Sequence, residues 1–412
     1  MPKNWKIYKL EEVAQLRKEG IKPSDFNGED YIGLEHIGQG DFLLDGIGKA
    51  SDVKSNKSKF VEGDILYGKI RPYFKKVYRP KFSGICSTDI LIINTKNENL
   101  VSQSYLHHLI KTQEFTDKAT ETSSGTKMPR ADWKSLEKWG ISFPPLPEQT
   151  QIANILSAID DKIENNLAIN KTLEDMAMAL YKHWFVDFGP FQDGEFIDSE
   201  LGLIPKGWEV KIIGNVIDTL GGGTPKTTEN SYWENGDILW YSPTDLTRDN
   251  AMFSLDSSKR INNLGLLKSS AKLFPPYSLL MSSRATIGAL TINTIKASTN
   301  QGFITMIPND NMSVYQLYSW TKWNMDLIIS KSNGSTFKEI SKANFRSLEI
   351  VVGQNIELFL RESKNIFDKV ENNIQENQSL TKLRDTLLPK LISGEVRLKE
   401  FREGIDAEMN SA

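Results

Sequence analysis

A long pattern of apolar residues constrains this chain more than any other feature. Over residues 152–184, apolar side chains recur in steps of four and three, no proline or glycine interrupts the run, and asparagines occupy the two central steps. This spacing is typical of one face of a long helix that packs against another helix as a coiled coil. The predicted contact residues are Ile152, Leu156, Ile159, Ile163, Asn166, Asn170 and Leu173.

The same pattern recurs 207 residues later, so that Asn166 corresponds to Asn373 and Asn170 to Asn377. The predicted contact residues of this second copy are Phe359, Ile366, Val370, Asn373, Asn377 and Leu380. A helix over the first segment would be roughly 50 Å long, which is more than a small globular domain needs. We therefore expect the two helices to pack antiparallel on each other within the chain, with the asparagines fixing the register. The alternative is a coil between separate chains.

The rest of the chain also divides into two corresponding halves, which open at Trp5 and Trp208. Each half combines short strands with a helix, predicted over residues 102–118 in the first half and 312–331 in the second. Each half ends in one of the long helices, which indicates an α+β protein with a pseudo-twofold internal repeat. Proline-rich and glycine-rich junctions mark the limits of the helices. The predicted parts are a globular domain over 1–146, a helix over 147–188, a second globular domain over 189–353, a second helix over 354–395, and a tail over 396–412.

Composition excludes several classes of protein. The 412 residues exceed what one core holds, and 39% apolar with 25% charged residues fit a folded domain. A single cysteine excludes an internal disulfide, and four histidines are too scattered for a metal cluster, so no metal ligand is predicted. We expect His107 and His108 to lie on an ordinary helix surface. With no signal peptide and no run of apolar residues long enough to span a membrane, we expect a cytoplasmic location.

No catalytic constellation is found in the sequence. The segment from Phe274 to Tyr277 is similar to the Pro-Pro-Tyr motif of adenine methyltransferases, but phenylalanine replaces the polar residue that accepts a hydrogen bond from the adenine amino group. The glycines of residues 221–223 are not followed by the Gly-Lys-Ser/Thr of a phosphate-binding loop. We therefore predict no catalytic residue, and a binding protein rather than an enzyme.

Charge is basic locally although the net charge is −3. Residues 69–81 hold six basic residues, three aromatic residues and no acid, and residues 257–309 contain no Asp or Glu. Such stretches favour phosphate binding, although a merely solvated face is the ordinary alternative. The polar turns near residues 123–130 and 332–338 are further candidates. The predicted DNA-binding residues are Lys69, Arg71, Lys75, Lys76, Arg79, Lys127, Arg130, Arg284, Thr286, Ser335, Thr336 and Lys338.

Several motifs together give a resemblance to a known family. They are Pro144-Pro145-Leu146-Pro147-Glu148-Gln149 with Ile152-Ala153, Ile159-Asp160-Asp161-Lys162-Ile163, Phe185-Val186-Asp187-Phe188, Gly202 with Ile204-Pro205-Lys206-Gly207-Trp208, Gly222-Gly223-Thr224-Pro225, and Leu387-Leu388-Pro389-Lys390-Leu391-Ile392-Ser393-Gly394-Glu395-Val396. With these motifs, nearly the whole chain resembles the specificity subunit of type I restriction-modification enzymes. One departure is visible, because the second helix lacks the Pro-Pro-Leu-Pro-Glu-Gln segment that precedes the first.

The resemblance implies two target recognition domains, each reading one half of a bipartite sequence in double-stranded DNA. It also implies an antiparallel coiled coil that sets the spacer and docks two methyltransferase subunits, which restriction subunits then join. S-adenosylmethionine, ATP and magnesium would belong to those partner subunits, with no cofactor in this chain. A coiled-coil scaffold without DNA readout and a self-sufficient DNA-modifying enzyme are the alternatives.

Overall fold

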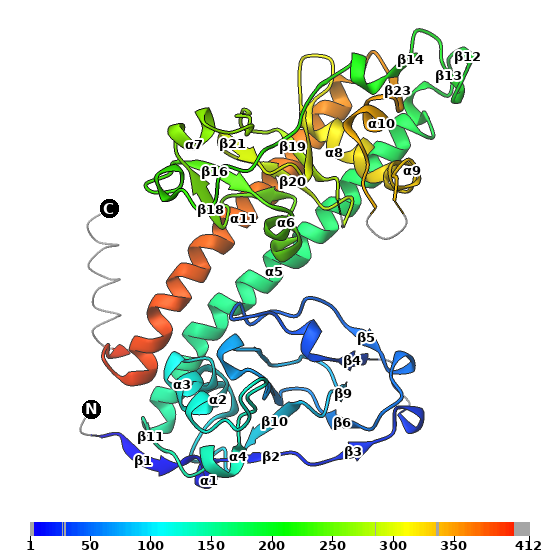
Figure 1. Ribbon diagram of the computed structural model, residues 1–412. Helices are drawn as coiled ribbons and strands as arrows, with labels where there is room; N and C mark the ends of the chain where they lie inside the picture. Colours follow the sequence, from blue (N-terminus) through cyan, green and yellow to red (C-terminus); the bar gives the residue numbers. More distant parts are fainter. Residues whose placement is uncertain (1–3, 27, 29, 285, 335–337, 399–412) are drawn as a thin grey trace, which may run out of the picture. The chain divides into compact units, whose positions relative to one another are not determined.

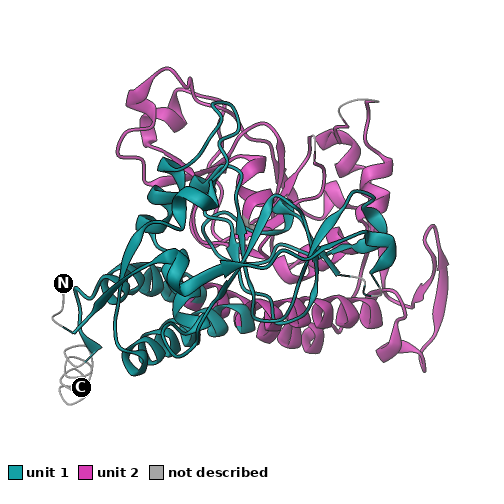
Figure 2. Cartoon of the chain, turned by 90° about the horizontal axis from the view of Figure 1, so that it is seen from below, with its two compact units in different colours: residues 1–165, 377–412 teal, residues 166–376 magenta. Residues whose placement is uncertain are grey.

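The computed structural model describes residues 4–26, 28, 30–284, 286–334 and 338–398. The chain forms two compact units, which Figure 2 distinguishes by colour: unit 1 comprises residues 1–165 and 377–412, and unit 2 comprises residues 166–376. Two long helices, α5 (Leu146–Phe185) and α11 (Glu357–Ser393), each contribute one half to each unit. The contacts thus divide the chain within these helices, whereas the predicted domain limits lie near the helix ends.

Unit 1 places three small sheets beside short helices (Figure 1). Their strand orders are β1-β11, β2-β10-β7-β8 and β3-β6-β9-β4-β5. The strands are β1 (Lys6–Lys9), β2 (Ala14–Leu16), β3 (Gly20–Ile21), β4 (Asp30–Ile32), β5 (Gly48–Lys49), β6 (Lys57–Phe60), β7 (Ile65–Gly68), β8 (Val77–Tyr78), β9 (Gly84–Cys86), β10 (Ile90–Thr95) and β11 (Gly140–Phe143). The helices are α1 (Leu10–Val13), α2 (Gln103–Ile110), α3 (Gln113–Glu121) and α4 (Trp133–Leu136).

Unit 2 repeats this design with its own sheets, in the strand orders β14-β23, β15-β22-β19-β20-β17 and β18-β16-β21, and adds the hairpin β12-β13. The strands are β12 (Phe196–Ser199), β13 (Gly202–Pro205), β14 (Glu209–Ile212), β15 (Asp218–Leu220), β16 (Ile238–Tyr241), β17 (Phe253–Ser254), β18 (Lys259–Ile261), β19 (Leu279–Ser282), β20 (Leu290–Asn293), β21 (Ala297–Thr299), β22 (Phe303–Ile307) and β23 (Glu349–Val352). The helices are α6 (Pro243–Asp249), α7 (Asn263–Leu267), α8 (Val314–Trp323), α9 (Met325–Ser330) and α10 (Lys342–Arg346).

The two units share the arrangement of their central strands. In unit 1, β10 pairs antiparallel with β2 on one side and with β7 on the other. In unit 2, β22 pairs antiparallel with β15 and β19 in the same way. Both β7 and β19 are buried at all four positions, because helices and loops cover both faces of these strands. This correspondence is the internal repeat that the sequence predicts.

The long helices pack antiparallel in each unit. In unit 2, the Asn166 side-chain amide donates to the Glu376 carboxylate at 2.8 Å, and the Asn373 amide donates to the Asn170 side-chain oxygen at 2.8 Å. In unit 1, the Asn377 amide donates to the Ile163 carbonyl at 3.2 Å. Residue numbers rise along α5 as they fall along α11, so the predicted intrachain pairing is present. The asparagines make specific polar contacts that fix this register.

The predicted apolar contact residues lie in the cores of their units. In unit 1, Ile152, Leu156, Ile159 and Ile163 are buried, and Leu380 is partly buried against the same core. In unit 2, Phe359 and Val370 are buried, while Leu173 and Ile366 are partly buried. The neighbour of Ile366, Phe367, is completely buried. Its ring contacts Phe253, Tyr315 and Tyr318, so a second face of α11 packs on the globular part of unit 2.

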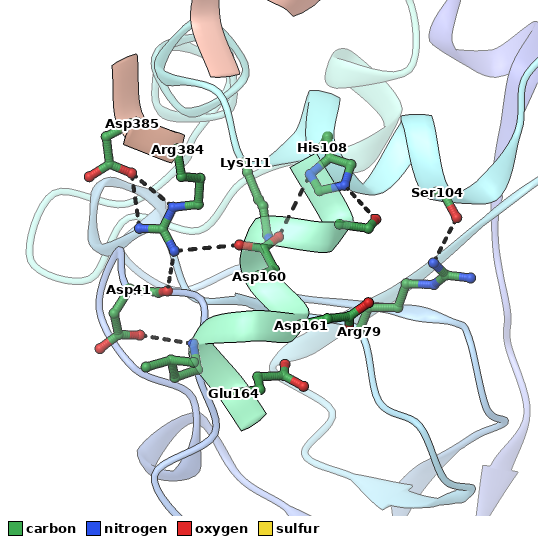
Figure 3. A network of polar contacts seen from close by, with 12 residues as sticks. Asp41, Arg79, Ser104, His108, Lys111, Asp160, Asp161, Glu164, Arg384 and Asp385 are labelled. Atoms are coloured by element: carbon green, nitrogen blue, oxygen red, sulfur yellow. Dashed lines mark hydrogen bonds and ion pairs between the residues drawn. The ribbon is translucent and has the colours of Figure 1, made fainter. Parts of the chain in front are cut away.

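Unit 1 attaches its part of the helix pair through a buried ion network (Figure 3). Lys111, at the end of α2, places its Nζ 2.6 Å from the Asp160 carboxylate on α5. Arg384 of α11 lies 3.6 Å from the same carboxylate and donates to the Asp41 carbonyl at 2.9 Å. Only 2% of the Lys111 side chain and 3% of the Arg384 side chain are exposed. Burial lowers the pKa of Lys111, and the charge of Asp160 opposes that shift.

The expectation that His107 and His108 lie on a helix surface is wrong. Both side chains are buried, and the His108 ring contacts the Ser157 hydroxyl of α5 at 3.0 Å. The helix that carries them is enclosed because α5 covers one of its sides and the strands cover another, which its own sequence does not reveal. Burial lowers the pKa of both rings well below 6.5.

Candidate nucleic-acid interface

Two loops of unit 1 bring most of its predicted DNA-binding residues together. The first, residues 69–75, follows β7 directly, and the second, residues 123–131, follows α3. Arg71 N donates to the Pro129 carbonyl at 2.7 Å, and Ala131 N donates to the Lys69 carbonyl at 2.9 Å. We call this pair of loops the unit 1 loop pair. Its backbone hydrogen bonds hold Lys69 and Arg71 on one scaffold with Arg130, which is distant from them in sequence.

The first loop is strained. Arg71 has φ 51° and Lys75 has φ 50°, and both lie in the left-handed region on either side of the single 3-10 turn Pro72–Phe74. Residues with a Cβ adopt this conformation at a cost, and glycine or asparagine would relieve it. Proline at the first position of the turn fixes its own φ, and Phe74 N closes the turn on the Arg71 carbonyl at 2.9 Å. Backbone strain of this kind clusters at functional loops.

The second loop closes on itself. Ser124 and Arg130 exchange two backbone hydrogen bonds, of 3.0 and 2.9 Å, and Gly125 has φ 91°, which favours glycine. Lys127, Met128 and Arg130 are exposed between or beside these closing contacts. The loop therefore presents basic and apolar side chains to solvent from a closed backbone.

Acidic residues partly neutralise the unit 1 loop pair. The Asp89 carboxylate lies 3.4 Å from Lys69 Nζ and 3.8 Å from Arg130 Nε. Lys69 Nζ also donates to the Thr88 carbonyl at 2.7 Å. Arg71 differs from these two residues, because its guanidinium lies 5.8 Å from the centre of the Phe74 ring and its buried Nε has no hydrogen-bond partner. Within the described ranges, Arg71 makes no ion pair with a carboxylate.

Two of the predicted DNA-binding residues of unit 1 point into the protein. Lys76 Nζ donates to the Leu34 carbonyl at 2.6 Å and to the Ile37 carbonyl. The Arg79 guanidinium donates to the Ser104 hydroxyl at 2.8 Å and to the Gly63 carbonyl at 3.2 Å. Burial lowers the pKa of both side chains. Their assignment to DNA stays a prediction, but their contacts are those of structural residues.

Unit 2 has a corresponding pair of loops after β19 and before α10. Ile340 N donates to the Ser283 carbonyl at 3.1 Å, and Asn333 and Glu339 exchange backbone hydrogen bonds of 2.8 and 2.9 Å. Gly334, with φ 98°, corresponds to Gly125 of unit 1. We call the described residues within 283–288 and 332–340 the unit 2 loop pair. Of the predicted residues, Arg284, Thr286 and Lys338 are exposed in it, and Ser335 and Thr336 lie outside the described residues.

The backbone pairing aligns the two loop pairs residue by residue. Ile70 pairs with Arg130 in unit 1, and Arg284 pairs with Glu339 in unit 2. Arg284 therefore corresponds to Ile70 and not to Arg71. Its Nε lies 2.7 Å from the Glu339 carboxylate. The same scaffold thus carries a free arginine in unit 1 and an arginine-carboxylate pair in unit 2.

Sequence reasoning missed a second feature of unit 2, which lies apart from the predicted residues. A cavity of about 390 Å³ is lined by Thr227, Asn230, Trp233, Glu234, Lys259 and Arg260. Lys259 Nζ lies 5.5 Å from the centre of the Trp233 ring, and that ring packs edge-on against Trp240. An aromatic ring beside two basic side chains suits a nucleic-acid surface. The acid-free stretch gave Lys259 and Arg260, but nothing in the sequence linked them to Trp233.

The described residues show no group of three or more His, Cys, Asp or Glu side chains arranged to hold a metal ion. None of the helices in the described ranges has the length and apolar character needed to cross a bilayer.

Comparison with known proteins gives consistent matches over most of the chain. A family model described as the type I restriction modification DNA specificity domain matches residues 2–175 and 205–382. The HindI specificity subunit of Haemophilus influenzae is 27% identical over 470 residues, which cover 95% of this chain and 100% of that protein. The MjaIX specificity subunit of Methanocaldococcus jannaschii is 27% identical over 427 residues, with 97% and 95% coverage.

A solved structure shares the fold. The crystal structure of a type I restriction-modification S subunit from M. genitalium matches with a TM-score of 0.56 and 16% sequence identity, over 94% of this chain and 96% of that one. At this identity the match concerns the fold. It agrees with two globular parts joined by long helices.

Proposed function

The chain belongs to the type I restriction modification DNA specificity domain family, and from this premise we propose how its two units select DNA. Each unit reads one half of a bipartite sequence in double-stranded DNA, and the loop pair of each unit supplies the contacts. The observation that carries this proposal is the recurrence of the loop pair. Both copies follow equivalent buried strands, and both display exposed basic side chains on a closed backbone. Rigid strands that carry adaptable loops are a common design for recognition sites.

The individual residues have different roles in this proposal. Lys127, Arg130 and Lys75 of unit 1 and Lys338 of unit 2 contact phosphates, because flexible basic side chains bind the DNA backbone without regard to sequence. Arg71 and the Arg284-Glu339 pair address base edges in this proposal, because arginine and glutamate match base donors and acceptors. Lys76 and Arg79 stabilise unit 1 and are left out of the interface. The Trp233 cavity extends the interface of unit 2.

The chain itself provides recognition and no catalysis. It works within a complex in which the paired helices dock two methyltransferase subunits, and restriction subunits join that assembly. S-adenosylmethionine, ATP and magnesium are used by those partners. The helix pair fixes the spacing between the two half-sites, since both units are built on the same two helices.

Exchange of one unit tests the proposal. The chain is produced in a host without adenine methylation together with a methyltransferase subunit encoded beside it, and the methylated positions are mapped across the genome. We expect one bipartite motif with a fixed spacer. Replacing residues 1–140 with the same segment of a relative is expected to change one half of the motif and to leave the other half and the spacer intact, because the helices are retained.

Three results would contradict the proposal. A change in both halves of the motif would mean that the units do not read independently. Methylation by the purified chain alone would establish a self-sufficient enzyme. A complex that assembles but methylates without a sequence motif would favour a scaffold without DNA readout.

A further inference from the structure

We propose that Arg71 determines specificity in unit 1 by reading a guanine in the half-site of that unit. This inference rests on the proposed function and deepens it to one residue and one base. It starts from the difference between Arg71 and the other basic side chains of the unit 1 loop pair. Lys69 and Arg130 share Asp89, whereas Arg71 has no carboxylate partner among the described residues. A guanidinium without an internal partner remains available for a ligand.

The backbone around Arg71 holds this side chain in place. Arg71 N is fixed by the Pro129 carbonyl at 2.7 Å, and its own carbonyl accepts from Phe74 N at 2.9 Å. Both hydrogen bonds maintain the left-handed conformation that asparagine or glycine would adopt at lower cost. An arginine at such a position indicates that its side chain is used, because strain persists where the surroundings enforce it.

The ring of Phe74 orients the guanidinium. The two groups lie 5.8 Å apart, and the edge-on packing of Phe74 on Tyr73, with centroids at 4.9 Å, limits movement of that ring. One edge of the guanidinium carries Nε, which is buried and unsatisfied in the free protein. A buried donor without a partner is costly, so the fold keeps this side chain at a cost, and the two Nη groups remain open to a ligand. Stacking on an aromatic ring also reduces the side-chain freedom that binding would otherwise remove.

The chemistry of the guanidinium points to guanine. Its planar fork donates two parallel hydrogen bonds, and guanine presents two neighbouring acceptors, O6 and N7, in the major groove. Adenine and thymine each combine one acceptor there with a donor or a methyl group, and cytosine presents a donor. A phosphate would accept the same fork, so the test must separate a base contact from a phosphate contact.

The half-site of unit 1 is first assigned by the exchange of residues 1–140, and the complex with the methyltransferase subunit is then tested with Arg71→Ala, Arg71→Lys and Arg71→Asn. Asparagine tolerates the left-handed backbone, so Arg71→Asn removes the guanidinium without adding strain. We expect all three variants to relax one G·C position of that half-site. The expected loss of discrimination is roughly 5- to 150-fold, measured by binding to duplexes that carry each base pair at that position. The second half-site and the spacer stay unchanged.

Lys75→Ala is the matched control, because Lys75 has the same charge and the same left-handed backbone at the other end of the turn. We expect this variant to weaken binding to all duplexes equally and to keep the motif. The proposal is overturned if Arg71→Ala lowers affinity uniformly with a smaller salt dependence and Arg71→Lys restores it, which is the behaviour of a phosphate contact. It is also overturned if the motif is unchanged or if the relaxed position is A·T. A wild-type complex that directs no bipartite motif would instead contradict the proposed function.

Discussion

The two units hold their shares of the helix pair by different chemistry. Unit 1 uses buried charge, with the Asp160 carboxylate between Lys111 and Arg384. Unit 2 buries aromatic rings instead, with Phe359 packed edge-on against Phe185 at 4.9 Å and Phe367 completely buried, and its ion pair between α8 and α5, Lys322 with Glu174, is partly exposed. The register of the helices and the order of the central strands recur in both units. The repeat therefore preserves backbone geometry, while the side chains that attach the globular part of each unit to the helix pair have diverged. We call this attachment the joint of each unit.

The loop pairs diverge in the same way. The backbone pairing of Arg130 with Ile70 recurs as that of Glu339 with Arg284, but a basic residue in one unit stands where an acid stands in the other. Two scaffolds with equal geometry and different charges are suited to two different half-sites. The contacts that hold the helix pair in the two units should therefore differ in their contribution to stability.

The largest expected effect comes from removing the shared carboxylate of unit 1. Asp160→Ala leaves Lys111 buried without its anionic partner and leaves Arg384 with only the exposed carboxylate of Asp385, and breaking such a buried pair costs about 3–5 kcal/mol. We expect unit 1 to lose about that much of its free energy of unfolding, while unit 2 is unaffected. Hydrogen exchange of α2 and of α8 in increasing denaturant measures the two units separately.

Asp161→Ala is the matched control on the next residue of α5. The Asp161 carboxylate is 62% exposed and pairs with Lys81, which is 63% exposed. Exposed pairs contribute about 0–1 kcal/mol, so this variant should resemble the wild type. Equal losses for the two variants would show that burial of the network does not matter to the joint.

The sequence predicted the repeat, the two helices and their antiparallel pairing, because heptad spacing is a local pattern that survives without tertiary information. It predicted single helices over 102–118 and 312–331, which are each broken in two. In unit 1 the break is at Thr112, whose hydroxyl accepts from Phe115 N at 3.2 Å and starts α3. A threonine inside an apolar pattern is compatible both with a position within a helix and with an N-cap.

The interface was harder to predict than the fold. Clustered basic residues located both loop pairs, but the sequence does not show that Lys76 and Arg79 turn inward or that Asp89 neutralises two of their neighbours. It also treated Asp160 and Arg384 as positions on helices rather than as partners. These contacts join residues that are distant in the chain. A single sequence does not show which residue of a loop faces which residue of a helix, and the pairing of charges depends on that.

Acid should weaken unit 1 more than unit 2. His107 and His108 are buried as neutral rings with pKa values well below 6.5, whereas the unfolded chain binds protons near pH 6.5. The stability that the neutral rings confer is complete above that pH and is lost as the pH falls below it, by up to about 1.4 kcal/mol per pH unit for each ring. The histidine of unit 2, His183, is exposed. We expect denaturant midpoints of unit 1 to fall between pH 6.5 and 5, with little change in unit 2.

The variant His107→Leu separates this effect from general acid sensitivity. In the wild type, His107 Nε2 has no hydrogen-bond partner. Leucine therefore removes a titrating group without leaving a polar group unpaired at that atom. The pH dependence of unit 1 should fall to about half, whereas His183→Gln should not change it. An unchanged slope in His107→Leu would assign the acid sensitivity to other groups.

The smallest effect concerns the start of α5, which the second helix does not reproduce. The Gln149 side chain is completely buried, donates to the Leu100 and Pro144 carbonyls at 2.8 and 2.9 Å, and accepts from Ser102 N at 3.0 Å. Gln149→Ala leaves these backbone groups without partners, at a cost of about 1–3 kcal/mol in unit 1. Gln354 precedes α11 and is exposed, so Gln354→Ala should stay within about 0.5 kcal/mol of the wild type. Similar losses in the two variants, measured by denaturant unfolding of the full chain, would mean that the two helix starts are anchored alike and that the divergence is confined to the Asp160 network.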